Sequence, residues 1–460
     1  MQVNIQMVIT NGDQKTVHDI LCFKRQELSP ETLGLTLKES KQVTAAIQQI
    51  MIIKQVEEYT SKRMRICAHC SKLQYIKGYH TIIYRTLFGK MHIRSPQIIE
   101  CSCERHETLS SSPLTKLLTD RVSPELLYLE SRWASLMSYG VTASLLEEVF
   151  PIQISSSTVC DTAMKVSARL EQELPEEKHM YVEGCQNAWD KLLRPGPPIT
   201  VGIDGGYVHA REGKNRKAGW FEVIVGKSMQ EEHESKRFGY VATYDRKSKR
   251  RLHEMLKEQG LQMNQEITFL TDGGETVRDL PSYLSPRSEH ILDWFHIAMK
   301  VTVMKQVAKG ILGNEYPKFQ DKIDSIKWYL WHGNVFRALH LLENLNEELD
   351  IASDTETEKR KLHKLVNEFD TYIQNNQGYI INYGEKYHHG ETIASSCAES
   401  AVDELISRRM VKKQHMRWTK KGAHLLLQLR VKTLNHDLRK SFIKWYPKME
   451  QENEPIPLAA

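Results

Sequence analysis

The sequence predicts a mixed α/β core, in which a sheet is covered by helices, joined to an all-helical segment. Three apolar runs follow one another as strands, and helices and strands then alternate, a pattern typical of a mixed sheet. The run from residue 315 to about residue 382 has a purely helical pattern. The predicted elements are strands at 198–203, 220–225 and 240–244, a helix at 248–259, a strand at 267–271, a short helix, a strand at 290–292 and a helix through 309.

This order, βββαβαβα, is that of the ribonuclease H-like (retroviral integrase-like) fold, and it gives the domain organisation that we expect. A small zinc-ribbon-like region and a helical DNA-binding region precede the core, and an all-helical insertion interrupts it. The expected divisions are 1–60 (N-terminal helical region), 61–110 (zinc-ribbon-like β region), 120–172 (helix-turn-helix-like), 195–310 with 392–440 (catalytic core), 311–391 (helical insertion) and 441–460 (C-terminal tail).

Length and composition indicate a folded protein of several domains. The chain has 460 residues, of which 40% are apolar and 26% charged, and this argues against disorder or a collagen-like repeat. No run approaches the ~18 apolar residues of a membrane span. The first fifteen residues lack the charged start and apolar run of a signal peptide, so we expect a cytoplasmic protein without membrane partners.

Positive charge is concentrated near the C-terminus. The whole chain carries 63 Lys and Arg against 58 Asp and Glu, a net charge of +5. Residues 408–440 hold eleven basic side chains and one acid, so this segment is +10 and the rest is −5. Such concentration predicts a polyanion partner, because bound phosphates release their counterions; a solvated basic helix is the alternative. The residues expected to bind DNA are Arg408, Arg409, Lys412, Lys413, Arg417, Trp418, Lys420 and Lys421. Trp418 would stack on an unpaired base, unless it is simply a core residue.

Four cysteines form two close pairs on either side of a predicted hairpin around Phe88-Gly89. Cys67 and Cys70 make a CxxC, and Cys101 and Cys103 make a CxC. A β-ribbon with a thiolate pair at each end can supply the tetrahedron of sulfurs that structural Zn²⁺ requires. Unliganded thiols are the alternative, and the nearby histidines that could substitute as ligands are His69, His80 and His106.

Helical signals lie on both sides of the cysteine region. Apolar residues at helical spacing predict a helix over 36–59. Ser123-Pro124 begins a second helix that we expect to end at Gly140, and two more helices are predicted over 142–149 and from 155 through 169. A short helix, a turn and a helix with a Ser/Thr cluster at its start are what a helix-turn-helix needs, although such triplets are common without DNA.

Two Asp-Gly-Gly sequences, at 204–206 and 272–274, each follow a predicted strand of the core. Asp204 follows the 198–203 strand and Asp272 follows the 267–271 strand. Neighbouring parallel strands that end in Asp place two carboxylates side by side at the carboxyl edge of the sheet. Two hard cations about 3.5 to 4 Å apart would balance their charge and hold both reacting oxygens of a phosphodiester. An ordinary turn is the alternative for either sequence alone.

A third carboxylate is expected from a helix that begins near Ser395. Glu399 lies among small residues that allow close packing on the sheet, and Asp403 is one turn further along the same face. The helix continues into the basic segment, so one element would supply a metal ligand and phosphate contacts. The chain contains neither a GxxxxGK[ST] loop nor a GxGxxG, which removes the usual support for nucleotide hydrolysis or nicotinamide chemistry.

Together these sequences resemble the DDE transposases of bacterial insertion sequences, most closely the ISKra type. The resemblance covers roughly residues 120–440 and rests on 202–206 (Gly-Ile-Asp-Gly-Gly), 271–274 (Thr-Asp-Gly-Gly), 293–296 (Asp-Trp-Phe-His) and 395–399 (Ser-Ser-Cys-Ala-Glu). It implies that Asp204, Asp272 and Glu399 form a metal-binding catalytic triad. It also implies that Asp293 and His296 support this site, as the Asp/Cys-x-x-His signature of related transposases does.

The resemblance implies an enzyme that binds the inverted repeats at the ends of its element and performs cleavage and strand transfer on double-stranded DNA. It further implies two Mg²⁺ ions, with Mn²⁺ as a substitute, target DNA as a second substrate, a homodimer or higher oligomer in the synaptic complex, and a bacterial, nucleoid-associated location. A ribonuclease H-fold nuclease without strand transfer is one alternative. A non-catalytic DNA-binding regulator derived from a transposase is another.

Overall fold

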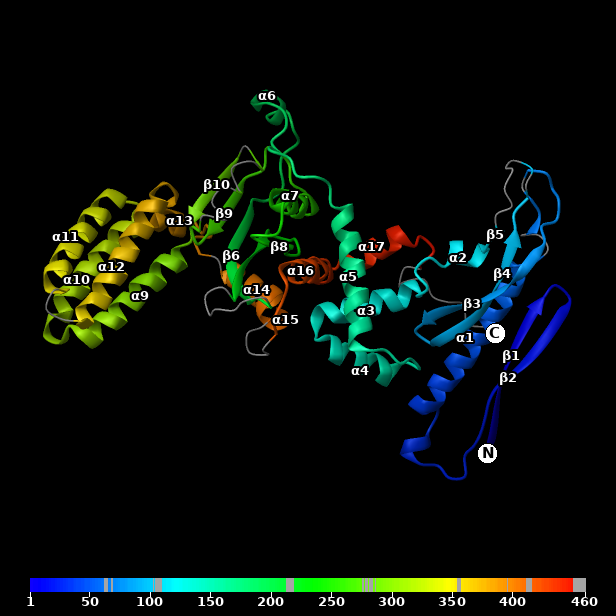
Figure 1. Ribbon diagram of the computed structural model, residues 1–460. Coiled ribbons are helices and arrows are strands. Elements are labelled where there is room, and N and C mark those ends of the chain that lie inside the picture. The colour runs from blue at the N-terminus through cyan, green and yellow to red at the C-terminus, as the bar shows by residue number, and fades with distance from the viewer. Residues whose placement is uncertain are drawn as a thin grey trace. The chain divides into compact units, whose positions relative to one another are not determined.

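The computed structural model divides the chain into two compact units (Figure 1). Met1–Ser167 and His436–Ala460 make up the N-terminal unit, and Ala168–Asn435 make up the core unit. The structure describes residues 1–61, 65–67, 69–101, 103, 110–211, 219–274, 277, 280, 284–285, 287–353, 357–394, 396–410 and 416–449. No helix within these ranges is long and apolar enough to cross a membrane.

The N-terminal unit begins with a β-hairpin, not with the helical region expected over residues 1–60. β1 (Gln2–Asn11) and β2 (Gln14–Lys24) pair antiparallel, and Gly12 has a φ of 58° in the turn. The alternation of polar and apolar residues from Gln2 to Gln6 has the period of a strand, so the signal was present. The expected helix does follow as α1 (Leu37–Tyr59), which begins at a capping box made by Thr36 and Glu39.

The hairpin predicted between the cysteine pairs is confirmed. β3 (Ile76–Thr86) and β4 (Gly89–Ile99) pair antiparallel, and the short β5 (Ser110–Ser111) pairs with the end of β4. One face of the hairpin is buried against α1, through side chains that include Ile82, Met91 and Ile93 of the hairpin and Ile52 and Val56 of the helix. The other face is exposed to solvent. This one-sided burial is typical of an antiparallel sheet.

Helices make up the rest of the N-terminal unit. They are α2 (Pro113–Leu117), α3 (Pro124–Leu136), α4 (Tyr139–Val149), the first part of α5 (Ser156–Glu173), and α17 (Leu438–Trp445), which packs against α3. Gly140 does not end a helix as expected but lies in the first turn of α4. The reason is Ser138, whose side chain caps the N-terminus of α4 by accepting a hydrogen bond from Val141.

The core unit contains a mixed five-stranded sheet in the order β10-β9-β6-β7-β8. β6 pairs antiparallel with β7, which pairs antiparallel with β8, whereas β9 and β10 run parallel to β6. The five strands are β6 (Ile199–His209), β7 (Trp220–Met229), β8 (Arg237–Val241), β9 (Ile267–Thr271) and β10 (Ser288–Leu292). All five predicted strands are therefore present, and β6 extends six residues beyond its expected end.

Helices cover both faces of this sheet. α7 (Ser248–Glu258) packs its apolar side chains against Ile199, Val201 and Ile203 of β6. On the opposite face, α14 (Ser396–Val402) packs against β6 and β7, and α16 (Lys420–Leu434) packs against β8. α14 continues into a π-helical turn (Asp403–Ser407) and then α15 (Arg408–Met410). The short α6 (Gln186–Trp189) precedes the sheet in the chain.

The all-helical segment packs on the β9–β10 side of the sheet (Figure 1). It comprises α9 (Trp294–Ile311), α10 (Tyr316–Trp331), α11 (Val335–Ser353), α12 (Thr357–Asn376) and α13 (Tyr383–His388). Its core includes Leu270 and Ile291 of the sheet. The predicted break at Gly333-Asn334 separates α10 from α11, and the one expected at Asp354 falls outside the described residues.

A close approach between strands makes Gly226 a sensitive position. A Cβ there would lie 2.3 Å from Cε1 of the buried Phe238 and 2.8 Å from the backbone oxygen of Gly202. We predict that Gly226→Ala destabilises the core unit by about 1 to 3 kcal/mol, the usual cost of overpacking. Denaturant unfolding measures this. Gly78→Ala is the control, because a Cβ at that strand glycine meets nothing within 4 Å; equal midpoints for the two variants would contradict the prediction.

Candidate active site

The sheet register places Asp204 beside Asp272. β6 and β9 pair in parallel up to Ile203 and Thr271, and the next residue on each side is the aspartate. Parallel neighbours lie about 4.8 Å apart, so the two residues are adjacent in the chain segments that leave this pairing. The expectation that Asp204 ends its strand is wrong. β6 continues to His209 because β7 remains paired to it, from Val225 opposite Asp204 to Trp220 opposite His209.

Asp204 projects from the face of the sheet that α14 covers. Side chains alternate along a strand, so Gly202, Asp204 and Gly206 share one face of β6. A Cβ at Gly206 would lie 2.6 Å from Cδ1 of Ile406 and 3.4 Å from Cγ1 of Val402, which shows how closely this helix crosses the strand. The glycine at 206 therefore leaves room for the helix beside Asp204.

Asp204 lies in a field of other ionisable groups. Burial raises its pKa, and the neighbouring negative charges of Asp272 and Asp293 add to this, while a hydrogen bond from the Gly205 amide (2.7 Å) and the nearby His296 act in the opposite direction. Four of the five residues that sequence analysis assigned to the site therefore act on one another electrostatically. Their side chains are not among the groups of three or more described residues whose ligand atoms lie within 4.8 Å of one another. Carboxylates that repel one another favour a cation between them.

Asp293 and His296 lie where β10 passes into α9. Asp293 is 1% exposed and caps α9, since its side chain accepts a hydrogen bond from the Phe295 amide at 2.8 Å. Its own amide donates to the oxygen of Thr271 at 2.8 Å, directly before Asp272. Asp293 is thus a helix cap, and its negative charge also acts on Asp204.

Glu399 lies on α14, which covers the face of the sheet that carries Asp204, and its side chain is exposed. Within the described residues, no hydrogen bond or ion pair joins it to Asp204 or Asp272. Its neighbours on the helix fix its position. Ser400 accepts a hydrogen bond from Lys227, which pairs with Gly202, and Val402 lies close to Gly206, so the helix that carries Glu399 crosses β6 next to Asp204.

An ion cluster that sequence analysis missed holds α14 against the sheet. Glu404, in the π-helical turn, accepts hydrogen bonds from Lys227 (3.0 Å) and Arg237, and its backbone oxygen accepts from Arg430 (2.8 Å). Burial alone would raise the pKa of Glu404, but the bonds from Arg237 and Lys227 lower it to about 2. π-Helical turns often occur at functional sites. No local sequence pattern signals these contacts, because Glu404 lies 177 positions from Lys227.

The helical segment supports the other aspartate. The Tyr372 hydroxyl of α12 donates to the backbone oxygen of Asp272 at 2.9 Å, and the Gly274 amide donates to its carboxylate at 3.0 Å. Gly273 has a φ of 80°, and a Cβ there would lie 2.5 Å from Oδ1 of Asn376. The segment between the second and third expected ligands therefore shapes the loop that carries Asp272.

The basic segment is only partly available to a polyanion. Arg409 is 2% exposed, with its guanidinium 5.4 Å from the ring centroid of Trp418, so its expected role in DNA binding is replaced by packing. Trp418 is half-buried. Its backbone pairs with the end of β6 through hydrogen bonds with His209 and Arg211. Arg408 is exposed but pairs with Asp403 at 2.9 Å, and Arg430 is buried. Lys412 and Lys413 lie outside the described residues.

Besides Arg408, three of the expected contacts are exposed in the structure: Arg417, Lys420 and Lys421. The two lysines occupy the first turn of α16, which Thr419 caps. Positive side chains at the positive end of a helix dipole are unfavourable, whereas an anion is favoured there. These residues form the part of the segment best placed for phosphate contact.

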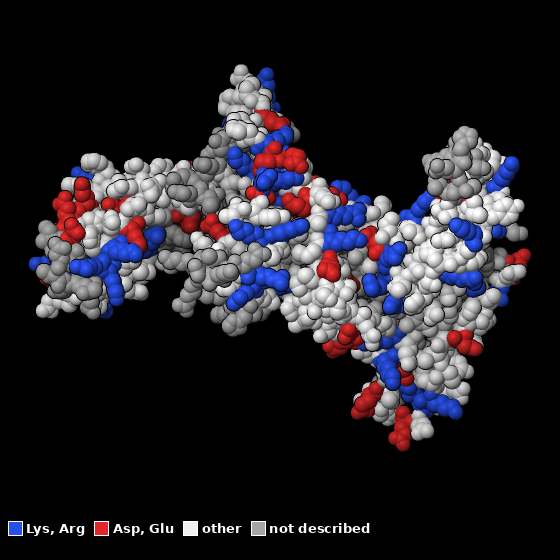
Figure 2. Space-filling view, in the orientation of Figure 1, with Lys and Arg blue, Asp and Glu red and all other residues white. Residues whose placement is uncertain are grey.

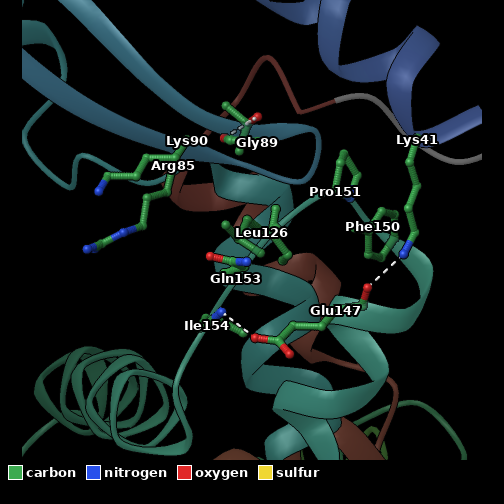
Figure 3. A pocket seen from close by; sticks show the side chains of 12 residues that line it. Lys41, Arg85, Gly89, Lys90, Leu126, Glu147, Phe150, Pro151, Gln153 and Ile154 are labelled. Carbon is green, nitrogen blue, oxygen red and sulfur yellow. Dashed lines mark hydrogen bonds between the residues drawn. The ribbon is translucent and has the colours of Figure 1, made fainter. Parts of the chain in front are cut away.

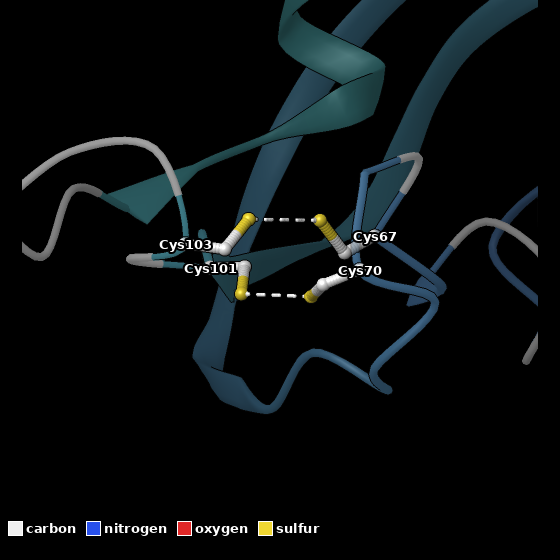
Figure 4. Close-up of side chains that lie close together, drawn as sticks. All are labelled: Cys67, Cys70, Cys101 and Cys103. Atoms are coloured by element: carbon white, nitrogen blue, oxygen red, sulfur yellow. Dashed lines mark hydrogen bonds between the residues drawn. The ribbon is translucent and has the colours of Figure 1, made fainter.

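In the N-terminal unit, the four predicted cysteines converge (Figure 4). Sγ of Cys67 lies 3.7 Å from that of Cys103, and Sγ of Cys70 lies 3.3 Å from that of Cys101. Four sulfurs about 2.3 Å from a tetrahedral metal would be about 3.8 Å apart, so this cluster fits a metal ion. Backbone amides of Cys70 and His69 lower the pKa of Cys67 to about 6. Of the candidate substitutes, His106 lies outside the described residues, and His80 bonds to Thr115 at 3.4 Å.

A second group of metal-ligand type, unforeseen from the sequence, occurs in the core unit at Glu171, Asp245 and His424. Arg251 occupies its centre: the guanidinium bonds to Glu171 at 2.6 Å, to Asp245 at 2.8 Å, and lies 3.0 Å from Nε2 of His424. Both carboxylates are therefore already bonded to the same guanidinium. The cluster ties the end of α5 and the loop after β8 to α7 and α16.

The sequence matches no family model and no curated protein. Among solved structures, the chain is similar to one described as "Drosophila P element transposase strand transfer complex", with 9% identity, a TM-score of 0.31, and 69% of this chain and 93% of that chain covered. It is also similar to "Crystal structure of NurA", with 13% identity, a TM-score of 0.11, and coverage of 63% and 65%. Similarities of this extent do not define the fold, which rests on the topology above.

The Arg251 cluster predicts a pH dependence of stability. Burial would raise the pKa of Glu171, but hydrogen bonds and charge from His424 and Arg251 lower it from 4.5 to about 2. A carboxyl whose pKa is depressed by folding stabilises the protein above its unfolded pKa, and this contribution, on the order of 3 kcal/mol, is lost as pH falls toward about 2.

We therefore expect Glu171→Gln to lower the unfolding midpoint at neutral pH, and the difference from the unsubstituted protein to shrink by roughly half at about pH 3. Urea unfolding across this pH range measures it. The exposed Glu176→Gln, on the same segment, is the control. A difference that does not depend on pH would mean that the carboxylate charge contributes nothing.

Proposed function

We propose that the chain is a DNA transposase of the DDE type, which cleaves the ends of its element and transfers them to target DNA. The observation that carries this proposal is the pair Asp204 and Asp272, adjacent on the central strands of the sheet. The strand order and directions support a ribonuclease H-like core, made of residues 195–310 and 392–440 with a helical insertion at 311–391. Assignment to the bacterial insertion sequences of ISKra type rests on the sequence resemblance.

Asp204, Asp272 and Glu399 are the residues that would hold two Mg²⁺ ions. When bound, such a pair supplies an activated water or 3′-hydroxyl and stabilises the charge of the leaving oxygen. The half-buried aspartates would fix the geometry of the site, and the exposed Glu399 would complete it from α14. Lys227 and Arg237 hold that helix through Glu404. His296, beside Asp204, would orient a carboxylate or contact the scissile phosphate.

The remaining parts would recognise DNA. The exposed Arg417, Lys420 and Lys421, with Arg408, Lys412 and Lys413, would bind phosphates near the scissile bond. The α3–α5 helices would act as a helix-turn-helix on the inverted repeats, beside a zinc-stabilised ribbon. Cleavage at two ends in one synaptic complex would require a homodimer or higher oligomer. A bacterial, nucleoid-associated location follows from the same proposal.

A nuclease without strand transfer has the same site chemistry, because both reactions need the same carboxylates. A non-catalytic regulator would have no need of the Asp204–Asp272 pair or of the contacts from Tyr372 and Glu404 that hold its surroundings. A reaction on DNA from the flanks of the reading frame separates these functions, because only a transposase would join the cut ends to a second DNA molecule.

We predict that Asp204→Asn, Asp272→Asn and Glu399→Gln each lower Mg²⁺-dependent end cleavage by about 10²-fold or more, since an amide cannot balance the charge of the ions and several kcal/mol of transition-state stabilisation is lost. The substrate is labelled DNA from either flank of the reading frame. Binding of this DNA in Ca²⁺ should change little.

Asp403→Asn is the matched control on the same helix, one turn beyond Glu399. It should keep most activity, because Asp403 pairs with Arg408 at the surface. If Asp403→Asn is inactive and Glu399→Gln is active, the third ligand is Asp403. Normal cleavage by Asp204→Asn or by Asp272→Asn would contradict the proposed catalytic site.

For the cysteine cluster, we predict one Zn²⁺ per chain, lost when Cys101 and Cys103 are both changed to Ser. The double variant should also show a lower thermal midpoint for the N-terminal unit, because a structural zinc site contributes directly to folding free energy. Elemental analysis and thermal unfolding measure the two effects. Cys160→Ser, at an isolated cysteine, is the control. Full zinc content in the double variant would mean that the metal lies elsewhere.

A further inference from the structure

The solvent-exposed face of the β3–β4 hairpin carries positive charge and no acid. Residues 72–99 contain five Lys or Arg and no Asp or Glu. Alternation along the two strands directs most of this charge outward: the exposed basic positions are Lys77, Arg85, Lys90, His92 and Arg94. Figure 2 shows Lys and Arg side chains over this part of the N-terminal unit.

The hairpin register groups three of these cations, Arg85, Lys90 and Arg94, toward the tip of the hairpin. Arg85 pairs with Lys90 across the strands, Ile83 with His92, and Thr81 with Arg94. Like charges directly opposite each other destabilise a sheet, so the Arg85–Lys90 pair lowers the stability of the hairpin as long as no anion binds there. The guanidinium of Arg94 lies 4.0 Å above the ring of Tyr79, which holds it flat on the surface.

No carboxylate among the described residues neutralises these cations in an ion pair. The acid whose charge Arg85 affects is Glu130, which is 2% exposed and whose pKa burial raises to about 7. It therefore carries only part of a charge at neutral pH. The opposite face of the hairpin is already packed on α1, so the charged face is the one left for a partner.

At the tip of the hairpin, the row continues into a cavity of about 630 Å³ (Figure 3). Arg85 and Lys90 lie at one end of it and Lys41 of α1 at the other, with the turn from Phe150 to Ile154 between α4 and α5 as a wall. Its one acid, Glu147, is occupied, since its carboxylate accepts from the Ile154 amide at 2.9 Å and its backbone oxygen accepts from Lys41 at 2.7 Å.

We propose that the exposed face of β3–β4, from Lys77 to the cavity at its tip, binds the backbone of duplex DNA and guides it to the turn between α4 and α5. This deepens the proposed function and rests on it, because it names a DNA-binding surface that neither the basic segment nor the helix-turn-helix provides. The major groove of B-DNA, about 12 Å wide, admits a two-stranded β-ribbon. The deep, narrow major groove of an RNA duplex does not, which favours DNA.

The test is DNA binding by the full chain carrying Arg85→Gln, Lys90→Gln and Arg94→Gln together. The probe is a fluorescent 30-base-pair duplex of mixed sequence, in Ca²⁺ to prevent cleavage. Each phosphate contact contributes about 0.9 to the slope of log affinity against log salt, so the triple variant should lose about 2 to 3 from that slope. Thermal unfolding checks that the variant is folded, since all three side chains are exposed.

A second variant carries the same loss of charge elsewhere in the N-terminal unit: Lys15→Gln, Lys24→Gln and Lys38→Gln, all exposed. Its slope should stay close to that of the unsubstituted chain. Equal slopes for the two triple variants would overturn the inference while leaving the proposed function intact. A chain that binds no DNA at all would overturn both. Tighter binding of an RNA duplex of the same sequence would overturn the assignment to DNA.

Discussion

The parallel pairing of β6 with β9 is the constraint on which the candidate site depends. Ile203 faces Thr271 in this register, and the next residue of each strand is an aspartate. A shift of one residue would turn one carboxylate to the opposite face of the sheet, where α7 packs its apolar side chains. The apolar core under β6 thus fixes the register, and the register fixes the site. The apolar packing of this core therefore holds the two aspartates next to each other although their negative charges repel.

The elements around the aspartates are arranged to preserve this geometry. Tyr372 and Asn376 of the helical segment hold the loop after β9, and Glu404 holds α14 through Lys227 and Arg237. Breaking a buried ion pair by removing one partner costs more than the pair itself contributes, because a charge is left uncompensated. The helical segment between Asp272 and Glu399 is therefore a structural part of the site, because its Tyr372 bonds to the backbone of Asp272.

The sequence predicts well those features that repeat at short range. Strand alternation and helix periodicity located all five strands of the core and the helical segment, and the spacing of two cysteine pairs around a hairpin led to the four sulfurs that the fold brings together. The N-terminal hairpin was missed although its alternation is visible. The Arg251 and Glu404 clusters were out of reach, because their members lie up to 177 positions apart and meet only in the folded chain. Counting charge in the basic segment likewise could not show that Arg409 would be buried.

Charge of one sign is gathered on each of the two units, and in both the fold bears the cost. In the core unit, the negative charges of Asp272 and Asp293 act on the half-buried Asp204 beside a closely packed helix. In the N-terminal unit, Arg85 faces Lys90 on an exposed sheet without an acid partner. Elsewhere the chain sets opposite charges against each other, as Arg251 does with Glu171 and Asp245. Like charges gathered at two places favour partners of the opposite sign there. Cations suit the carboxylates and a polyanion suits the basic face, and these are the two components that a metal-dependent reaction on DNA brings together.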